Sequence, residues 1–141
     1  FLINKNYPSE INIIIQKTTF LANINILDEN FLIGSNKRLI KSELSNPNLP
    51  TVVGNPSLKD FFLINDNIMK SSIKLSDIKK LYFFPSKRWD LELNSGIFIK
   101  LPMKDPINSL NKYFQIKSLP QFNDVKIFDM RVENQIIINE S

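Results

Sequence analysis

The sequence predicts an α+β domain, a mostly antiparallel β-sheet with two helices packed on it. Short runs rich in β-branched residues recur along the chain, and turn sequences such as Asn94-Ser95-Gly96 separate several of them. Two longer segments carry apolar residues at helical spacing, and each follows a capping-type residue close to a proline. At 141 residues the chain has the length of one domain, or of one domain with a fragment of another.

β-Strands are expected throughout the first part of the chain. Glu10–Gln16 is short and β-branched, which is typical of a buried strand. Phe20–Ile26 alternates between residue types, so it predicts a second strand with Asn23 on the face opposite its isoleucines. A turn at Asp28–Asn30 connects this strand to Phe31–Ile33 in a predicted hairpin.

Two helices are expected among the later strands. Asn55-Pro56-Ser57 supplies helix-start chemistry for a helix that runs to about Lys70. The apolar stripe of this helix is expected to face the core and comprises Leu58, Phe61, Phe62, Ile68 and Met69. Asp105-Pro106 repeats the start signature for a helix that runs to about Lys117. Further strands are expected at Leu39–Ile40, Thr51–Val53, Ile78–Phe84, Trp89–Leu93, Ile97–Leu101, Val125–Met130 and Gln135–Ile138.

The residue types in the chain exclude most catalytic chemistry. Cysteine and histidine are both absent, which removes thiolate metal sites, thiol catalysis and the commonest general base near pH 7. The three glycines each stand at a turn, so no phosphate-cradling loop is predicted. On one strand face, Asp90 and Glu92 would lie about 6.5–7 Å apart, which overlaps the spacing of glycosidase carboxylates. Such pairs are common on solvated strands, and we expect no enzyme, no cofactor and no metal site.

The net charge of +4 does not indicate a nucleic-acid partner. The eighteen basic residues include only three arginines, and the lysines are scattered singly or as the pair Lys79-Lys80. No basic run is present that could follow a phosphate backbone. No apolar run approaches the roughly 20 residues that a membrane span requires, and no signal peptide is present. Because the sequence opens on Phe1, we expect a fragment, and any segment that anchors or targets the protein would lie upstream.

The last predicted strand, Gln135–Ile138, is the strongest candidate for a binding site. It is apolar after its first residue, and too few residues follow it to form another strand. At the edge of the sheet, its N–H and C=O groups would be a template for a strand from a partner. In the centre of the sheet it would be covered and unable to bind. The residues alone leave these two alternatives open.

A series of motifs occurs in the same order as in one known family. The motifs are Lys5–Pro8 followed by Ile11–Ile15, Leu21-Ala22, Leu27–Asn30, Leu49–Gly54, Arg88–Gly96 and Val125–Arg131. Together they resemble the extracytoplasmic region of the bacterial cell-division family FtsQ, which is also called DivIB. The tryptophan hairpin and the Asp-x-Arg strand are the more specific of these motifs. The chain departs from the family at Lys17 and Phe20, where Glu and Pro are frequent.

The resemblance implies two parts and a location. Residues 1–18 would be the C-terminal remnant of a POTRA domain, and residues 19–141 would be the β domain of the family. The whole protein would be a single-pass protein of the bacterial inner membrane, with this region in the periplasm at the division septum. It would act as a non-enzymatic scaffold of the divisome.

The resemblance also implies partners and contact residues. FtsB and FtsL would be the partners, and FtsB would add a β-strand to the last strand of the β domain. The expected contact residues are Arg131, Val132, Glu133, Asn134, Gln135, Ile136, Ile137 and Ile138. A basic residue before the tryptophan, Lys87 or Arg88, would hold an acidic side chain of the partner.

Two other function classes remain as alternatives. A POTRA-type chaperone or transport-associated domain would use the same edge to bind strands of outer-membrane proteins. A hydrolase with a Ser-Lys dyad is compatible with residue spacing, although no glycine elbow presents a serine.

Overall fold

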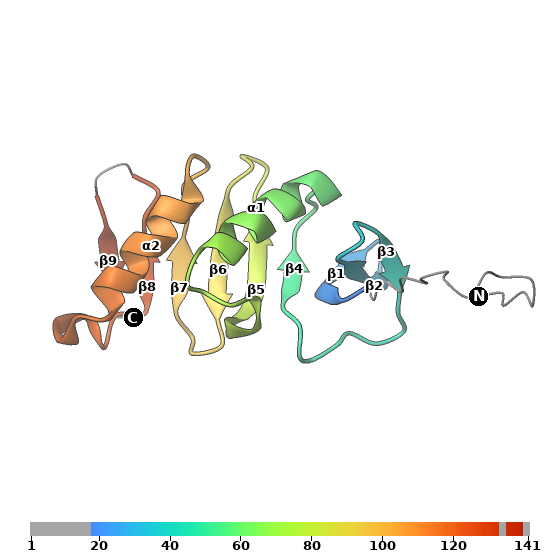
Figure 1. Cartoon of the computed structure of the whole chain (residues 1–141), viewed down its shortest axis with the longest axis horizontal. Helices are drawn as coiled ribbons and strands as arrows, with labels where there is room; N and C mark the ends of the chain where they lie inside the picture. The colour runs from blue at the N-terminus through green and yellow to red at the C-terminus, as the bar shows by residue number, and fades with distance from the viewer. Residues whose placement is uncertain (1–17, 133–134, 140–141) are drawn as a thin grey trace, which may run out of the picture.

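The computed structural model describes residues 18–132 and 135–139, which form one mixed β-sheet with two helices over one of its faces (Figure 1). The strand order across the nine-stranded sheet is β3-β2-β1-β4-β5-β6-β7-β8-β9. The predicted strand Glu10–Gln16 lies outside the described residues, as does all of the expected POTRA remnant except Thr18.

The elements agree closely with the periodicity of the sequence. The strands are β1 (Phe20–Ile26), β2 (Glu29–Gly34), β3 (Leu39–Lys41), β4 (Thr51–Val53), β5 (Ile78–Phe83), β6 (Trp89–Leu93), β7 (Phe98–Lys100), β8 (Ile127–Asp129) and β9 (Ile137–Asn139). The helices are α1 (Leu58–Lys70) and α2 (Pro106–Lys117), with short 3-10 turns η1 (Leu75–Asp77) and η2 (Pro120–Phe122).

The predicted α+β class with a mostly antiparallel sheet is confirmed. The parallel neighbours are β1–β4, β4–β5 and β7–β8, and the other strand pairs are antiparallel. Parallel neighbours require a crossover connection. The chain makes one such crossover through α1 between β4 and β5, and another through α2 between β7 and β8. Both helices therefore lie over the same face of the sheet (Figure 1).

The core lies between this face and the helices. A row of buried side chains crosses neighbouring strands in register: Leu81 on β5, Leu91 on β6, Ile99 on β7 and Phe128 on β8. The helices contribute the buried residues Phe61, Ile64, Ile68, Leu110 and Tyr113. Burial of such side chains is worth roughly 1.5–3 kcal/mol each, so this layer fixes the sheet from β5 to β8.

The two helices begin in different ways. Ser57, within the predicted start signature Asn55–Ser57, is the residue that caps α1. Its hydroxyl accepts from the Asp60 N–H at 3.1 Å while the Asp60 carboxylate accepts from the Ser57 N–H at 3.1 Å. Asp105 precedes α2 but has a left-handed backbone, with φ at 52°, and its side chain makes no capping bond. Pro106, whose ring fixes a helical φ, is the residue that favours the start of α2.

Three sequence predictions need correction in detail. Met69 is 69% exposed, because it lies about 100° around the helix from the buried Ile68. The first hairpin turns at Leu27 and Asp28, which both have positive φ, and Glu29 already pairs with Ile26. The last strand begins at Ile137 and ends at Asn139, two residues later than the predicted start.

Candidate docking surface

Strand β9 forms one edge of the sheet. It pairs with β8 in antiparallel register, Phe128 opposite Ile138 and Asp129 opposite Ile137, and no strand of the described chain lies on its other side. Ile137 is 52% exposed and Ile138 is 41% exposed. Of the two alternatives that the sequence left open, the structure therefore shows the edge position.

The strand carries apolar side chains on both faces of the sheet. Ile138 is in register with the buried Phe128 and lies on the helix-covered face, whereas Ile137 is in register with Asp129 on the open face. Ile136, just before β9, is partly buried against the core. Val132 is also exposed, and its carbonyl accepts from the Gln135 N–H at 3.2 Å. Glu133 and Asn134, two of the predicted contact residues, lie outside the described residues.

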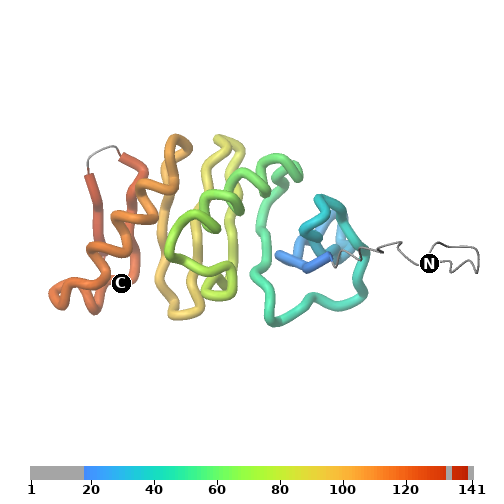
Figure 2. Tube along the Cα trace, in the orientation of Figure 1, coloured from blue at the N-terminus to red at the C-terminus, as the bar shows by residue number. Residues whose placement is uncertain are grey.

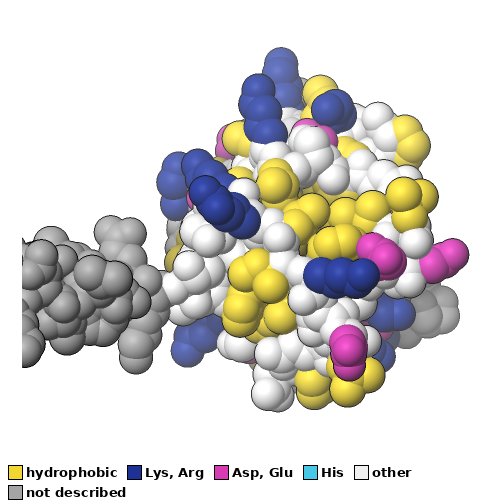
Figure 3. Space-filling view, turned by 90° about the vertical axis from the view of Figure 1, so that its right-hand side faces the viewer, with side chains coloured by type: hydrophobic (Ala, Val, Ile, Leu, Met, Phe, Trp, Pro, Cys, Tyr) yellow, Lys and Arg dark blue, Asp and Glu magenta, His cyan; other side chains and the backbone are white. Residues whose placement is uncertain are grey.

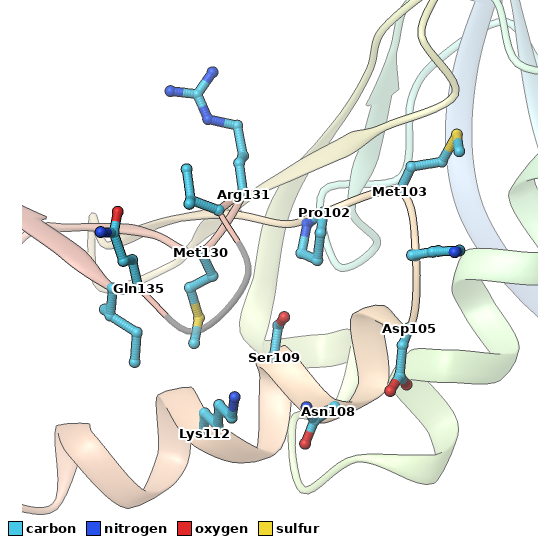
Figure 4. A pocket seen from close by; sticks show the side chains of 12 residues that line it. Pro102, Met103, Asp105, Asn108, Ser109, Lys112, Met130, Arg131 and Gln135 are labelled. Atoms are coloured by element: carbon cyan, nitrogen blue, oxygen red, sulfur yellow. The ribbon is translucent and has the colours of Figure 1, made fainter.

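A cavity of about 940 Å³ lies on the helix side of this segment (Figure 4). Its walls come from the start of α2, the loop between β7 and α2, and the segment that joins β8 to β9. Its deepest residues are Ser109 on α2 and Met130 after β8, which are both buried. Lys104, Lys112 and Arg131 also line the cavity, together with one acidic residue, Asp105.

On the open face of the sheet, charged side chains line up across neighbouring strands. Tyr82, Asp90, Lys100 and Asp129 are consecutive partners in register from β5 to β8. Asp129 accepts two hydrogen bonds from the Arg131 guanidinium, at 2.8 and 2.6 Å. The hydrogen bond with Arg131 lowers the pKa of the Asp129 carboxyl below its usual value and raises the pKa of Arg131. This end of β8 is therefore held by an ion pair.

Lys87 and Arg88 both have partners within the chain. The Lys87 Nζ lies 3.3 Å from the Asp60 carboxylate, and the Arg88 guanidinium bonds to Asp90 and, at 3.3 Å, to the Leu101 carbonyl. Both residues precede β6, and strands β7 and β8 lie between β6 and the edge strand β9. The structure therefore does not bring these two side chains into the Arg131–Ile138 segment.

The carboxylates that raised the question of catalysis are engaged in structural contacts. Asp90 is paired with Arg88, and Glu92 accepts from the Tyr82 hydroxyl at 2.7 Å and lies 3.7 Å from the Lys79 Nζ. Among residues 18–132 and 135–139, no group of three or more acidic, histidine or cysteine side chains could hold a metal ion. In the same ranges no helix is long and apolar enough to cross a bilayer.

The opposite edge of the sheet is β3, and the tube in Figure 2 shows the two edges at opposite ends of the molecule. Figure 3 views the molecule from the β3 end, where hydrophobic side chains lie among basic ones. Leu39 and Ile40 are partly exposed there, and the Lys41 Nζ lies 3.2 Å from the Glu29 carboxylate. The β3 edge thus provides an internal comparison for β9.

Sequence reasoning missed two features of this surface. The cavity joins residues 102–112 with residues 130–132 and 135–136, two stretches that are separated in the sequence, so no local pattern could have indicated it. The Asp129–Arg131 pair lies within a motif that the sequence did single out, Val125–Arg131. The spacing of an acidic and a basic residue two positions apart was the available signal.

The fold and its exposed last strand define an α+β domain whose sheet remains open at the C-terminal end. A family model described as "Cell division protein FtsQ/DivIB, C-terminal" matches residues 24–131. The chain belongs to this FtsQ/DivIB family of cell division proteins, as its motifs indicated. The matched region ends at Arg131, so β9 lies beyond it.

A solved structure has the same fold. It is the major extracytoplasmic domain of the trans isomer of the cell division protein DivIB from Geobacillus stearothermophilus. The likeness has a TM-score of 0.54 at 15% sequence identity, and it covers 77% of this chain and 98% of that chain. No curated protein sequence matches the chain.

Proposed function

We propose that this chain is the periplasmic docking part of a non-enzymatic divisome scaffold, and that a partner adds a β-strand to β9. The observation that carries the proposal is the edge position of β9, with both isoleucines exposed. An exposed apolar edge is an aggregation hazard unless something covers it. Membership of a cell division family favours another division protein as the covering chain.

The proposed partners are FtsB and FtsL, with FtsB providing the added strand. Main-chain hydrogen bonds would supply affinity, and side chains that alternate between the two faces would supply specificity. Ile138 would meet the partner on the helix-covered face and Ile137 on the open face, as their register with β8 indicates. The proposal includes a membrane anchor upstream of Phe1, a POTRA domain that ends at residue 18 and a location at the septum.

A basic residue near the tryptophan is the second part of the proposed contact. Both side chains have partners within the chain, but that of Lys87 is 64% exposed, whereas that of Arg88 is 16% exposed. Lys87 is therefore the better candidate to hold an acidic side chain of the partner. Because surface ion pairs are weak, this contact would select the partner more than it would strengthen binding.

The test is proline substitution in β9. Successive N–H groups of a strand point alternately to its two sides, so one of Ile137 and Ile138 directs its N–H away from β8. We expect Ile137→Pro or Ile138→Pro, whichever leaves the melting temperature unchanged, to abolish co-purification with FtsB. Ile40→Pro, the same change in the other edge strand, is the matched control and should leave binding intact.

The outcomes separate the candidate functions. Retained FtsB binding in both β9 variants would contradict docking at this edge. Binding of unfolded outer-membrane strands in place of FtsB, lost in the same variants, would support the chaperone alternative. Turnover of a substrate that survives occupation of β9 would support a hydrolase.

A further inference from the structure

Asp129 holds the chain where it leaves β8. The Arg131 backbone N–H donates to the Asp129 Oδ1 at 3.1 Å, the Nε donates to the same oxygen at 2.8 Å, and the Nη2 donates to Oδ2 at 2.6 Å. One carboxylate thus fixes both the main chain and the side chain of Arg131. Charge-assisted pairs of this bidentate kind are the geometrically most specific hydrogen bonds in proteins.

These bonds replace the sheet pairing at the point where it stops. The Met130 N–H still donates to the Lys100 carbonyl of the neighbouring strand, at 2.9 Å. The next N–H, that of Arg131, finds its acceptor in the Asp129 side chain instead. A side chain that accepts from the backbone two residues later is a turn-forming device. Asp129 therefore ends the ladder and redirects the chain toward β9.

The same residue lies directly opposite the start of the return strand. Asp129 is the register partner of Ile137, the first residue of β9. Strand β9 has three residues, all exposed, and within the described residues it pairs with β8 alone. A short exposed strand with hydrogen bonds on one side opens more readily than the strands inside the sheet. The fraction of time for which β9 is extended consequently depends on how the chain leaves β8.

We infer that Asp129 is a positioning residue of the docking edge, since its hydrogen bonds to Arg131 fix the chain where it leaves β8 and so favour the extended, paired form of β9. The inference rests on the proposed function. Asp129 lies outside the contact segment Arg131–Ile138 that the sequence indicated. In this inference the Arg131 guanidinium binds Asp129 of its own chain and does not contact the partner.

A direct contact between Arg131 and the partner leads to the opposite expectation. If Arg131 meets a carboxylate of the partner, removal of the Asp129 charge frees the guanidinium and strengthens binding. If Asp129 positions the edge, the same removal weakens binding, because fewer molecules have β9 ready. A tenfold fall in the ready fraction weakens the apparent affinity about tenfold.

The experiment compares Asp129→Asn with the wild-type chain. Asn puts an NH2 group where the Arg131 Nη2 donates, so the bidentate pair is lost with little change in volume. We measure the affinity for the extracytoplasmic region of FtsB and, in the free chain, hydrogen exchange of the β9 amides. We expect about tenfold weaker binding, faster exchange in β9 and only a small fall in melting temperature, since the native state loses the pair that lowers the Asp129 pKa.

Two further variants make the result decisive. Glu29→Gln removes the Lys41 ion pair at the other edge of the sheet and should leave FtsB affinity and β9 exchange unchanged. Asp129→Ala, which removes every acceptor, should weaken binding at least as much as Asp129→Asn. Unchanged or tighter binding in Asp129→Asn, with unchanged β9 exchange, overturns the inference about Asp129. The proposed function still stands in that case, provided that the wild-type chain binds FtsB. If the wild-type chain does not bind FtsB, the proposed function fails and the exchange measurement alone decides the role of Asp129.

Discussion

At the scale of single residues, the basic side chains that were candidates for partner contact are engaged within the chain. Lys87 bonds to Asp60, Arg88 to Asp90, and Arg131 to Asp129. The sequence showed these residue types but did not show that they pair. Arg88 and Asp90 are two positions apart, as are Asp129 and Arg131, and the local backbone conformation decides whether such side chains meet. The Lys87 pair joins residues on different elements and could not have been predicted from local spacing.

Tyr82 gives the residue-scale prediction. Partial burial, and then the hydrogen bond and the charge of Glu92, raise the pKa of Tyr82 to about 12, above the value of about 10 in unfolded chains. The folded state therefore favours the neutral phenol, and the stability from this group is complete below about pH 10. It is lost as the pH rises toward 12. We expect the urea midpoint to fall across this window in the wild-type chain and to fall less in Tyr82→Phe.

The other titrating groups are the same in both chains, so the difference between the two curves isolates Tyr82. Equal declines in the wild-type chain and in Tyr82→Phe would contradict the raised pKa. The difference in phenolate absorbance between the two chains provides a direct check, because burial also raises the pKa of Tyr113 and total absorbance would mix the two signals. The Tyr82 signal should develop at a higher pH than that of an ordinary tyrosine.

At the scale of elements, local sequence patterns predicted the helices and strands but not which strands are neighbours in the sheet. Both helices and every strand expected from Phe20 onward are present, because apolar periodicity and turn residues act over a few positions. The strand order was not predicted. Strand β4 enters between β1 and β5 and lies parallel to both, and nothing within Thr51–Val53 specifies those neighbours.

Asn23 shows why the position of β4 in the sheet could not be predicted from the sequence. The alternation of residue types in Phe20–Ile26 predicted that the Asn23 side chain lies on the face opposite the isoleucines. Asn23 is nevertheless buried, with 1% exposure. Its amide donates to the carbonyls of Asn46 and Leu49, at 2.8 and 3.2 Å, and accepts from the Asn46 N–H at 2.7 Å. A buried asparagine thus ties the loop before β4 to β1, and this tie positions the crossover.

The element-scale prediction follows from that tie. Asn23→Ala leaves partly buried backbone groups of the Asn46–Leu49 loop without these partners, which costs about 1–3 kcal/mol per group. We expect the free energy of unfolding in urea to fall by about 2–3 kcal/mol with an unchanged slope. Asn25→Ala, an exposed position on the same strand, is the control and should change stability by less than about 0.5 kcal/mol. A loss below about 1 kcal/mol in Asn23→Ala would contradict this role.

At the scale of the whole molecule, the sheet has two edges and one helix-covered face. The sequence predicted the layers and the apolar last strand, but only the three-dimensional order shows that β9 is an edge and that β3 is the other. The likeness to an extracytoplasmic DivIB domain extends over 77% of the chain and agrees with this layered arrangement. The docking proposal therefore depends mainly on one end of the molecule, and apart from the contact proposed for Lys87 the remaining surface should take no part.

This asymmetry can be measured over the whole chain at once. Hydrogen exchange in the complex with FtsB should slow at the β9 amides by roughly tenfold or more, because new interstrand hydrogen bonds add to the local opening free energy. The amides of β3, at the other edge, should exchange at the same rate with and without FtsB, since no partner strand reaches them. Slower exchange at β3, or on the open face around Tyr82 and Lys100, with no change at β9, would place the contact elsewhere. Equal slowing throughout the chain would instead indicate global stabilisation by binding, because a ligand of the native state protects every amide that exchanges through global unfolding. A footprint confined to β8, β9 and the walls of the adjoining cavity is the result that strand addition requires.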